Sequence, residues 1–146
     1  MTDVSRSREV AAEPAAVWAL LADFGSLSAW ADGVDHSCLL SAGPGGIGLT
    51  RRVQSGRDTF VEKITAFDPP RLLAYDIQGV PPRFSVSNRW NLRPRGGHGT
   101  TVTLTSTVAM TMSILRPVGE RAFAQMMARR SEALLNSLVR ALGGAS

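Results

Sequence analysis

Hydrophobic and polar residues alternate with a period of two through the middle of the chain. The clearest case is Phe84–Leu92 (FSVSNRWNL), where every second residue counted from Phe84 is apolar except Asn88. This alternation is typical of a strand with one face on a core and the other in water. A buried amide needs hydrogen-bond partners that an apolar face does not supply. Asn88 is therefore either a contact for a ligand or a partner for another polar residue such as Tyr75 or Ser106.

The same patterns predict helices at both ends of the chain. An amphipathic helix begins at Pro14, and a second short helix is expected over Leu27–Trp30. A long helix is expected over about Leu115–Leu142, with Gly143 and Gly144 as its stop. The predicted strands are Val4–Ala11, Val34–Leu40, Ile47–Gln54, Asp58–Phe67, Leu72–Gln78, Phe84–Leu92 and Thr100–Met110.

The order of these elements indicates the fold class. Six consecutive strands without a helix between them argue against a parallel α/β fold. Short connectors rich in Gly and Pro suit antiparallel hairpins, including GPGGIG at 43–48, which lies between two strands and not before a helix. We predict an α+β fold in which a curved seven-stranded antiparallel sheet surrounds the long C-terminal helix and the two short helices close one end. Residues 1–146 are expected to form a single domain.

Three segments carry a family resemblance: residues 9–34 (EVAAEPAAVWALLADFGSLSAWADGV), 62–77 (EKITAFDPPRLLAYDI) and 99–108 (GTTVTLTSTV). They resemble the START-like, or helix-grip, superfamily (SRPBCC proteins), and specifically its polyketide cyclase/dehydrase branch. The resemblance implies a deep, largely apolar cavity between the long helix and the concave sheet. Members of this superfamily bind lipids, hormones, polyketides or quinone-type molecules, and only some are enzymes, so the resemblance specifies the fold better than the chemistry.

The apolar parity of each strand predicts which side chains line this cavity. It places Cys38, Ile47 and Ala66 inward together with polar residues that interrupt the apolar faces. The polar interruptions are His36, Arg51, Glu62, Tyr75, Asn88 and Ser106. The predicted ligand-binding residues are Arg51, Phe60, Tyr75, Phe84, Val86, Asn88, Trp90, Ser106, Phe123 and Met127.

His36 and Glu62 are the candidate catalytic residues. A histidine can take and return a proton near neutral pH, which a cyclisation or a dehydration needs. The alternative is a histidine that is satisfied by a neighbour near the cavity mouth. Arg51 and Glu62 face each other if their strands form a hairpin, and a buried Arg51 would require Glu62 or an anionic ligand group. A structural ion pair at the rim of the sheet is the alternative for that pair.

Composition limits the partners and cofactors. The net charge is +4, but the arginines are scattered, so nucleic-acid binding is not expected. A single cysteine, Cys38, excludes an intrachain disulfide and a cysteine-clustered metal site, and without a nucleotide motif we expect no cofactor. We find no apolar run of the roughly 20 residues that span a membrane and no signal-peptide pattern, which predicts a cytoplasmic protein without an integral membrane segment. A monomer or a homodimer is expected.

Together these observations favour a protein that binds an apolar or aromatic small molecule, polyketide-, lipid- or quinone-like, in a central cavity. Activity as a cofactor-independent polyketide cyclase/dehydrase is one form of this hypothesis. The alternative is a non-catalytic carrier or sensor of a hydrophobic ligand that acts through a protein partner. In that case the loops 54–58 and 78–83 close over the ligand and present a surface to the partner.

Overall fold

A computed structural model describes residues 1–41, 46–81, 84–110 and 116–143 of the chain. The expected start of the long helix at Leu115 and parts of the loops at 43–48 and 78–83 lie outside these residues. Seven strands, two α-helices and one 3₁₀-helix follow one another as β1 (Thr2–Val10), α1 (Pro14–Ala22), η1 (Phe24–Ala29), β2 (His36–Leu39), β3 (Thr50–Ser55), β4 (Asp58–Asp68), β5 (Leu72–Gln78), β6 (Phe84–Pro94), β7 (Thr100–Met110) and α2 (Arg116–Ala141).

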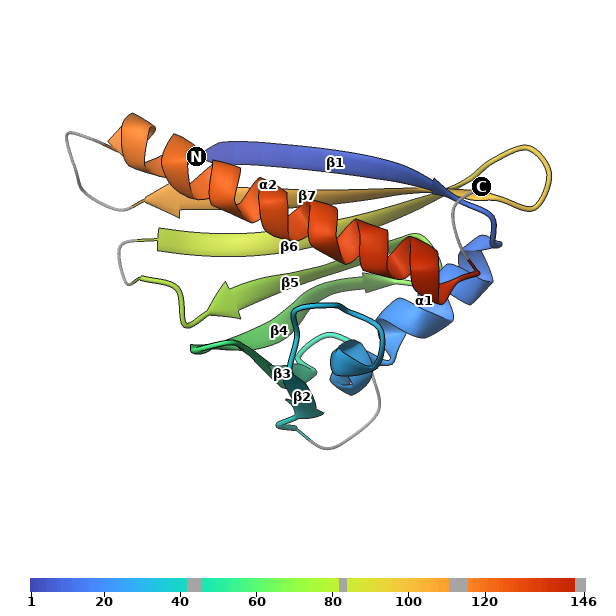
Figure 1. Ribbon diagram of the computed structural model, residues 1–146, viewed down its shortest axis with the longest axis horizontal. Helices are drawn as coiled ribbons and strands as arrows, with labels where there is room; N and C mark the ends of the chain where they lie inside the picture. Colours follow the sequence, from blue (N-terminus) through green and yellow to red (C-terminus); the bar gives the residue numbers. More distant parts are fainter. Residues whose placement is uncertain (42–45, 82–83, 111–115, 144–146) are drawn as a thin grey trace.

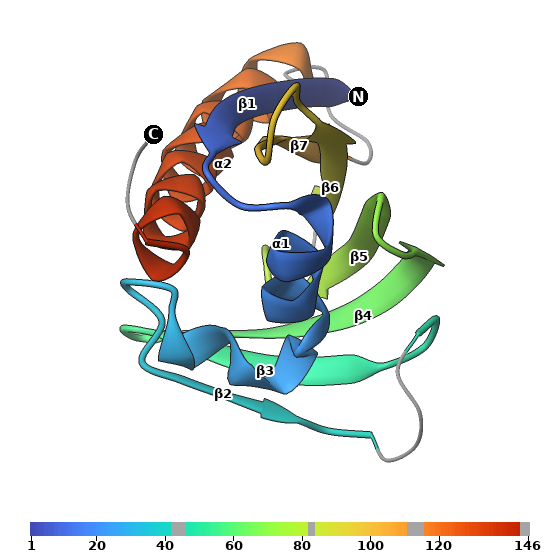
Figure 2. The same ribbon diagram turned by 90° about the vertical axis from the view of Figure 1, so that its right-hand side faces the viewer.

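The seven strands form one antiparallel sheet in the order β1-β7-β6-β5-β4-β3-β2. Figure 1 shows α2 crossing diagonally in front of the β1 side of the sheet. In Figure 2 the sheet curls from β1 at the top to β2 at the bottom, with α2, α1 and η1 inside the curl. This is the predicted α+β helix-grip arrangement, so the fold class inferred from the strand and helix patterns is confirmed.

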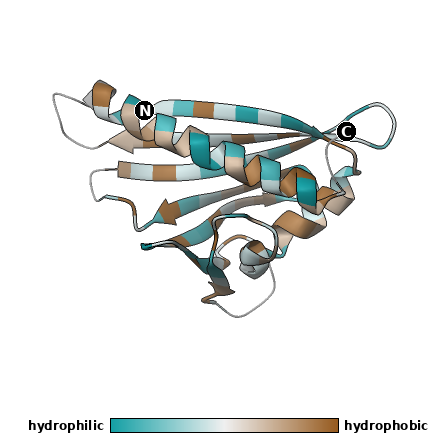
Figure 3. Cartoon of the chain, in the orientation of Figure 1, coloured by the Kyte–Doolittle hydropathy of each residue, from teal (hydrophilic) through white to brown (hydrophobic). Residues whose placement is uncertain are grey.

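The long helix α2 packs on β1 and β7 through its apolar stripe. Leu134, Leu135 and Leu138 are buried, as are Val102, Leu104 and Val108 at alternate positions of β7. Alternation along the strand and helical spacing along α2 therefore bring two apolar surfaces together, as their periods predict. The face of α2 seen in Figure 3 carries both hydrophobic and hydrophilic residues.

The two short helices close one end of the curled sheet. Val17, Leu21, Phe24 and Leu27 are buried in the common core. Trp18 packs edge-on against Phe67 of β4, with ring centroids 5.2 Å apart. This end of the curl is therefore filled by side chains, and an opening to the interior must lie elsewhere.

The second and third strands are shorter than predicted. β3 begins at Thr50, not at Ile47, because Gly46 and Gly48 have φ angles of 116° and 93°. A left-handed backbone cannot continue a strand, and the amide of Leu49 instead donates to the carbonyl of Gly46 in a turn. Ile47 is consequently 75% exposed, which overturns its predicted inward position.

The predicted inward face of β2 is wrong. His36 and Cys38 are exposed, and Ser37 is the residue that faces inward. The Ser37 hydroxyl donates to the carbonyl of Gly25 at 2.8 Å and accepts from the amide of Ser28 at 2.9 Å. β2 is an edge strand covered by the backbone of η1, so its inner neighbour is polar and favours a small hydroxyl over an apolar side chain. In such a strand, the alternation of apolar residues does not predict which side chains face inward.

A bulge in β4 overturns the inward position predicted for Ala66. The register with β5 shifts between Ile64 and Ala66, so the parity of the strand changes there. After the bulge Phe67 lies opposite Leu73 and packs on Trp18. The parity predicted for Phe60, Glu62 and Ile64, which precede the bulge, is correct.

Candidate functional site

Polar residues of three neighbouring strands form a row across the concave face of the sheet. Tyr75 lies opposite Asn88, and Asn88 lies opposite Ser106. The Ser106 hydroxyl donates to Asn88 Oδ1 at 2.6 Å, and Asn88 Nδ2 donates to the Tyr75 hydroxyl at 3.4 Å. Ser131 of α2 extends the row, 3.3 Å from Ser106. Asn88 points inward as predicted, and its amide is satisfied by Tyr75 and Ser106.

Tyr75 contacts both this row of polar residues and the charged residue Arg51 beside it. Its hydroxyl also accepts a hydrogen bond from Trp90 Nε1 at 3.2 Å. Burial raises the pKa of the Tyr75 phenol, and the negative charge of Glu62 raises it further. The phenol is therefore neutral at physiological pH.

Arg51 and Glu62 form a buried ion pair. Arg51 Nε donates to Glu62 Oε1 at 2.8 Å, and Nη2 lies 2.6 Å from the same oxygen. Nη1 donates to the carbonyl of Phe24 at 3.0 Å. The guanidinium carbon lies 3.8 Å from the centroid of the Phe24 ring and 4.9 Å from that of Tyr75. The predicted pairing is confirmed, and with side chains 4% and 2% exposed it lies in the interior, not at the rim.

The interior beside this pair is almost completely filled. A void of about 10 Å³ touches Arg51, Tyr75 and Trp90 beneath the short helices. A space of that size holds about one water molecule at most. Any ligand that contacts Tyr75 must therefore displace side chains that are packed together.

A larger pocket opens between α2, β4 and the β5–β6 connection. Its volume is about 410 Å³, and we call it the α2–β5 pocket. Its lining is mostly apolar or aromatic and consists of Asp58, Phe60, Ile77, Gly79, Val80, Pro81, Phe123, Met126, Met127 and Arg130. A mostly apolar pocket with few polar groups and a volume of roughly 300–1,000 Å³ is typical of small-molecule sites.

Arg130 connects this pocket to the buried ion pair. Its guanidinium carbon lies 4.6 Å from the centroid of the Phe60 ring, and its Nη2 lies 4.0 Å from Glu62 Oε2. Along β4, Asp58 is exposed, Phe60 is half-buried and Glu62 is buried. These residues share one face of the strand, so the pocket runs from Asp58 at its mouth to Arg130 at its inner end.

The ten predicted ligand-binding residues divide into three groups. Phe60, Phe123 and Met127 line the α2–β5 pocket, and Phe84 stacks on Phe123 with ring centroids 4.3 Å apart. Arg51, Tyr75 and Trp90 border the small void, while Val86, Asn88 and Ser106 are buried between the sheet and α2. His36 lies on the exposed outer face of β2, away from both spaces, because the parity of that strand is reversed.

Arg130 is a residue of the pocket that our sequence analysis did not select. The adjacent Arg129 and Arg130 have the appearance of a solvated helix face. However, Arg130 follows Phe123 by seven positions and Met127 by three, which places it on the same side of a helix as both. This helical spacing is the feature of the sequence that could have indicated Arg130 as a pocket residue.

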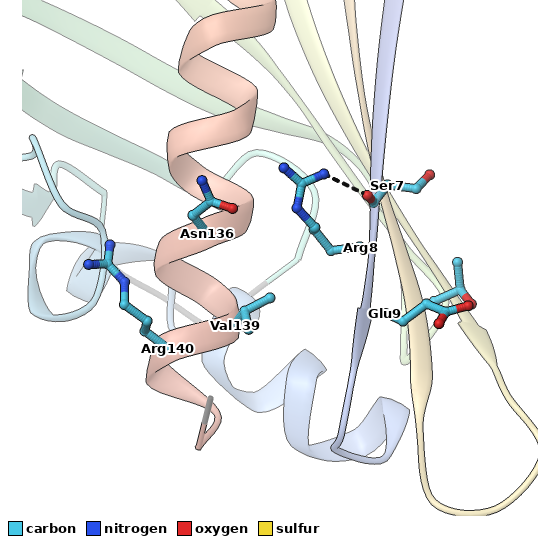
Figure 4. A pocket seen from close by; sticks show the side chains of 7 residues that line it. Ser7, Arg8, Glu9, Asn136, Val139 and Arg140 are labelled. Carbon is cyan, nitrogen blue, oxygen red and sulfur yellow. Dashed lines mark hydrogen bonds between the residues drawn. The ribbon is translucent and has the colours of Figure 1, made fainter. Parts of the chain in front are cut away.

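A second, wider groove of about 770 Å³ lies between β1 and the C-terminal half of α2 (Figure 4). Its charged side chains already have partners. Arg8 pairs with Glu132, and Arg140 pairs with Asp32 and extends from α2 away from β1. The smaller α2–β5 pocket, in contrast, reaches the buried ion pair through Arg130, so we take it as the candidate site.

No helix in the described parts of the chain is long and apolar enough to cross a membrane. Within the same residues, no group of three or more His, Cys, Asp and Glu side chains is arranged to hold a metal ion.

A curved antiparallel sheet around a long C-terminal helix, with a pocket between them, defines a START-like helix-grip protein. The chain belongs to the family described as "Polyketide cyclase / dehydrase and lipid transport", which matches residues 1–143. No curated protein matches the chain significantly.

Solved structures share this fold. The ZhuI aromatase/cyclase from Streptomyces sp. R1128 superimposes with a TM-score of 0.79 at 21% identity, over 99% of each chain. A protein from Thermobifida fusca gives 0.78 at 25% identity, over 100% of this chain and 98% of the other. A START superfamily protein from Mycobacterium smegmatis gives 0.71 at 16% identity, over 96% and 98%.

Proposed function

We propose that residues 1–146 act as one ligand-binding domain that holds an apolar or aromatic small molecule, polyketide-, lipid- or quinone-like, in the α2–β5 pocket. The observation that carries this proposal is the pocket itself, with a volume of about 410 Å³, apolar walls and a charged group at its inner end. The family to which the chain belongs supports it, since its description names lipid transport beside cyclase and dehydrase activity.

Binding fits the charged residues better than proton transfer does. One oxygen of Glu62 is held by two groups of Arg51, and its other oxygen faces Arg130. Glu62 is 2% exposed and is not part of the lining of the α2–β5 pocket, so it is not within reach of a proton on a ligand there, as a general base must be. His36, the other candidate base, is exposed on the outer face of the sheet.

The test uses a pair of variants matched in exposure. Met126 in the pocket lining is 55% exposed, and Leu40 beside the opposite edge strand is 54% exposed. We expect the neutral dye Nile red to bind the unchanged protein saturably, with a rise in fluorescence. Met126→Trp narrows the pocket and should weaken binding at least about tenfold, while Leu40→Trp should leave it unchanged. Equal binding by both variants, or no saturable binding at all, would contradict the proposal.

A cofactor-independent cyclase or dehydratase is the second candidate. The neutral Tyr75 phenol borders the small void and can donate a hydrogen bond to the carbonyl oxygen of a ligand that displaces the side chains packed there. For a ligand identified by native mass spectrometry of the purified protein, this candidate predicts a kcat at least about 100-fold lower in Tyr75→Phe. If the protein is a carrier, the ligand is not converted, and both the variant and the parent protein should release it chemically unchanged.

A further inference from the structure

The inner end of the α2–β5 pocket carries an excess of positive charge. Arg51 and Arg130 are both directed to Glu62, so two guanidinium groups share one carboxylate. The neighbouring Tyr75 phenol is neutral, because burial and the charge of Glu62 raise its pKa. Asp58, the acidic residue among the pocket lining, lies at the mouth, four residues from Glu62 along β4 and therefore about 13 Å away.

Arg51 and Arg130 differ in the hydrogen-bond donors that remain available to a ligand. Arg51 uses its nitrogen atoms on Glu62 and on the Phe24 carbonyl, and its flat face lies against two aromatic rings. Arg130 approaches Glu62 only to 4.0 Å, which is longer than a hydrogen bond. Its side chain is 25% exposed and lines the pocket, and Phe60 supports one face of its guanidinium group. Of the two arginines, and among the residues that the structure describes here, Arg130 is therefore the cation with donors available to a ligand.

We propose that the α2–β5 pocket selects amphipathic anions, with the carboxylate, enolate or phenolate end of the ligand bound to Arg130 and the apolar body lying between Phe60, Phe123 and Met127. This inference rests on the function proposed above and adds the charge and the orientation of the ligand. A planar guanidinium matches a carboxylate with two parallel hydrogen bonds, and the partial burial of Arg130, whose side chain is 25% exposed, strengthens them. The reverse orientation would place the anion beside Asp58, whose charge repels it.

The test compares two probes that share one ring system. 2-Naphthoate carries a negative charge, whereas 2-naphthamide is neutral and of nearly the same shape. A hydrogen bond to a charged group contributes about 1.5–3 kcal/mol, so isothermal titration should show naphthoate binding roughly 10- to 100-fold more tightly. Arg130→Gln should abolish this preference, so that the variant binds the two probes with equal affinity.

Arg129→Gln is the matched control, because Arg129 is the adjacent arginine and is exposed. It removes the same net charge from the same helix, and the preference for naphthoate should persist. Equal affinities of the parent protein for the two probes would overturn the inference while leaving the proposed function intact. An equal loss of preference in both arginine variants would also overturn it, because the effect would then come from net charge. Failure of both probes and of Nile red to bind would instead refute the proposed function itself.

Discussion

The buried pair of Arg51 and Glu62 makes a strong prediction about stability. Glu62→Gln keeps the size of the side chain and one acceptor oxygen but leaves Arg51 without its counter-ion. The two side chains are only 4% and 2% exposed, so water cannot replace the lost charge. Removing one partner of a buried pair costs about 3–5 kcal/mol. That is a large part of the roughly 5–15 kcal/mol by which domains are stable.

Urea unfolding followed by tryptophan fluorescence measures this loss. An exposed pair provides the control: Arg71 and Asp68 are 63% and 54% exposed, and breaking their contact with Asp68→Asn should cost less than about 1 kcal/mol. The double variant Arg51→Met with Glu62→Leu removes both charges. Its loss of unfolding free energy should be at least about 2 kcal/mol smaller than the summed losses of Arg51→Met alone and Glu62→Leu alone. A loss below about 1 kcal/mol for Glu62→Gln, or strict additivity in the double variant, would refute this reasoning.

Three further predictions follow from other contacts. Asn88→Ala leaves the Ser106 hydroxyl without its acceptor and should lower the free energy of unfolding by about 2 kcal/mol, measured by the same urea titration. Tyr75 is the one tyrosine of the chain, and burial raises its pKa above 10.0, so absorbance at 295 nm should show less than half of it as phenolate at pH 10.0 in the folded protein. Stability should fall above that pH, because the unfolded chain ionises first. The N-terminal ammonium and the Met110 amide lower the pKa of Glu120 from 4.5 to about 2. This carboxylate should therefore stabilise the protein fully above pH 4.5 and lose that effect as the pH falls toward 2. In Glu120→Gln, the loss of stability over this pH range should be smaller than in the parent protein.

The fold was predictable because two periods and the order of the elements determine it. Alternation along Phe84–Pro94 and helical spacing along Arg116–Ala141 each define one apolar face, and the two faces pack together. The same logic failed on β2, where Ser37 faces the backbone of η1, and after the bulge in β4 at Ile64. In both places the inward neighbour or the register depends on tertiary contacts that a local pattern does not contain.

The candidate site was predictable in part. Strand parity found the inward polar residues Arg51, Glu62, Tyr75, Asn88 and Ser106, because each interrupts an apolar face. Pairing of these side chains with one another was one predicted alternative, but choosing it over contact with a ligand requires the strand register and the position of Ser131 on α2. Strand parity also missed Arg130, because it does not apply to a helix, where the spacing of Arg130 from Phe123 and Met127 has to be considered instead.

The most direct test of the central claim is to locate a bound apolar probe by NMR. Met126 and Met127 both line the α2–β5 pocket, and their methyl signals, labelled with carbon-13, can be assigned from Met126→Leu and Met127→Leu. As Nile red is added, the account predicts that both signals shift along the saturation curve given by the dye's fluorescence. Saturable fluorescence without movement of either signal would show that the dye binds elsewhere and would contradict the account.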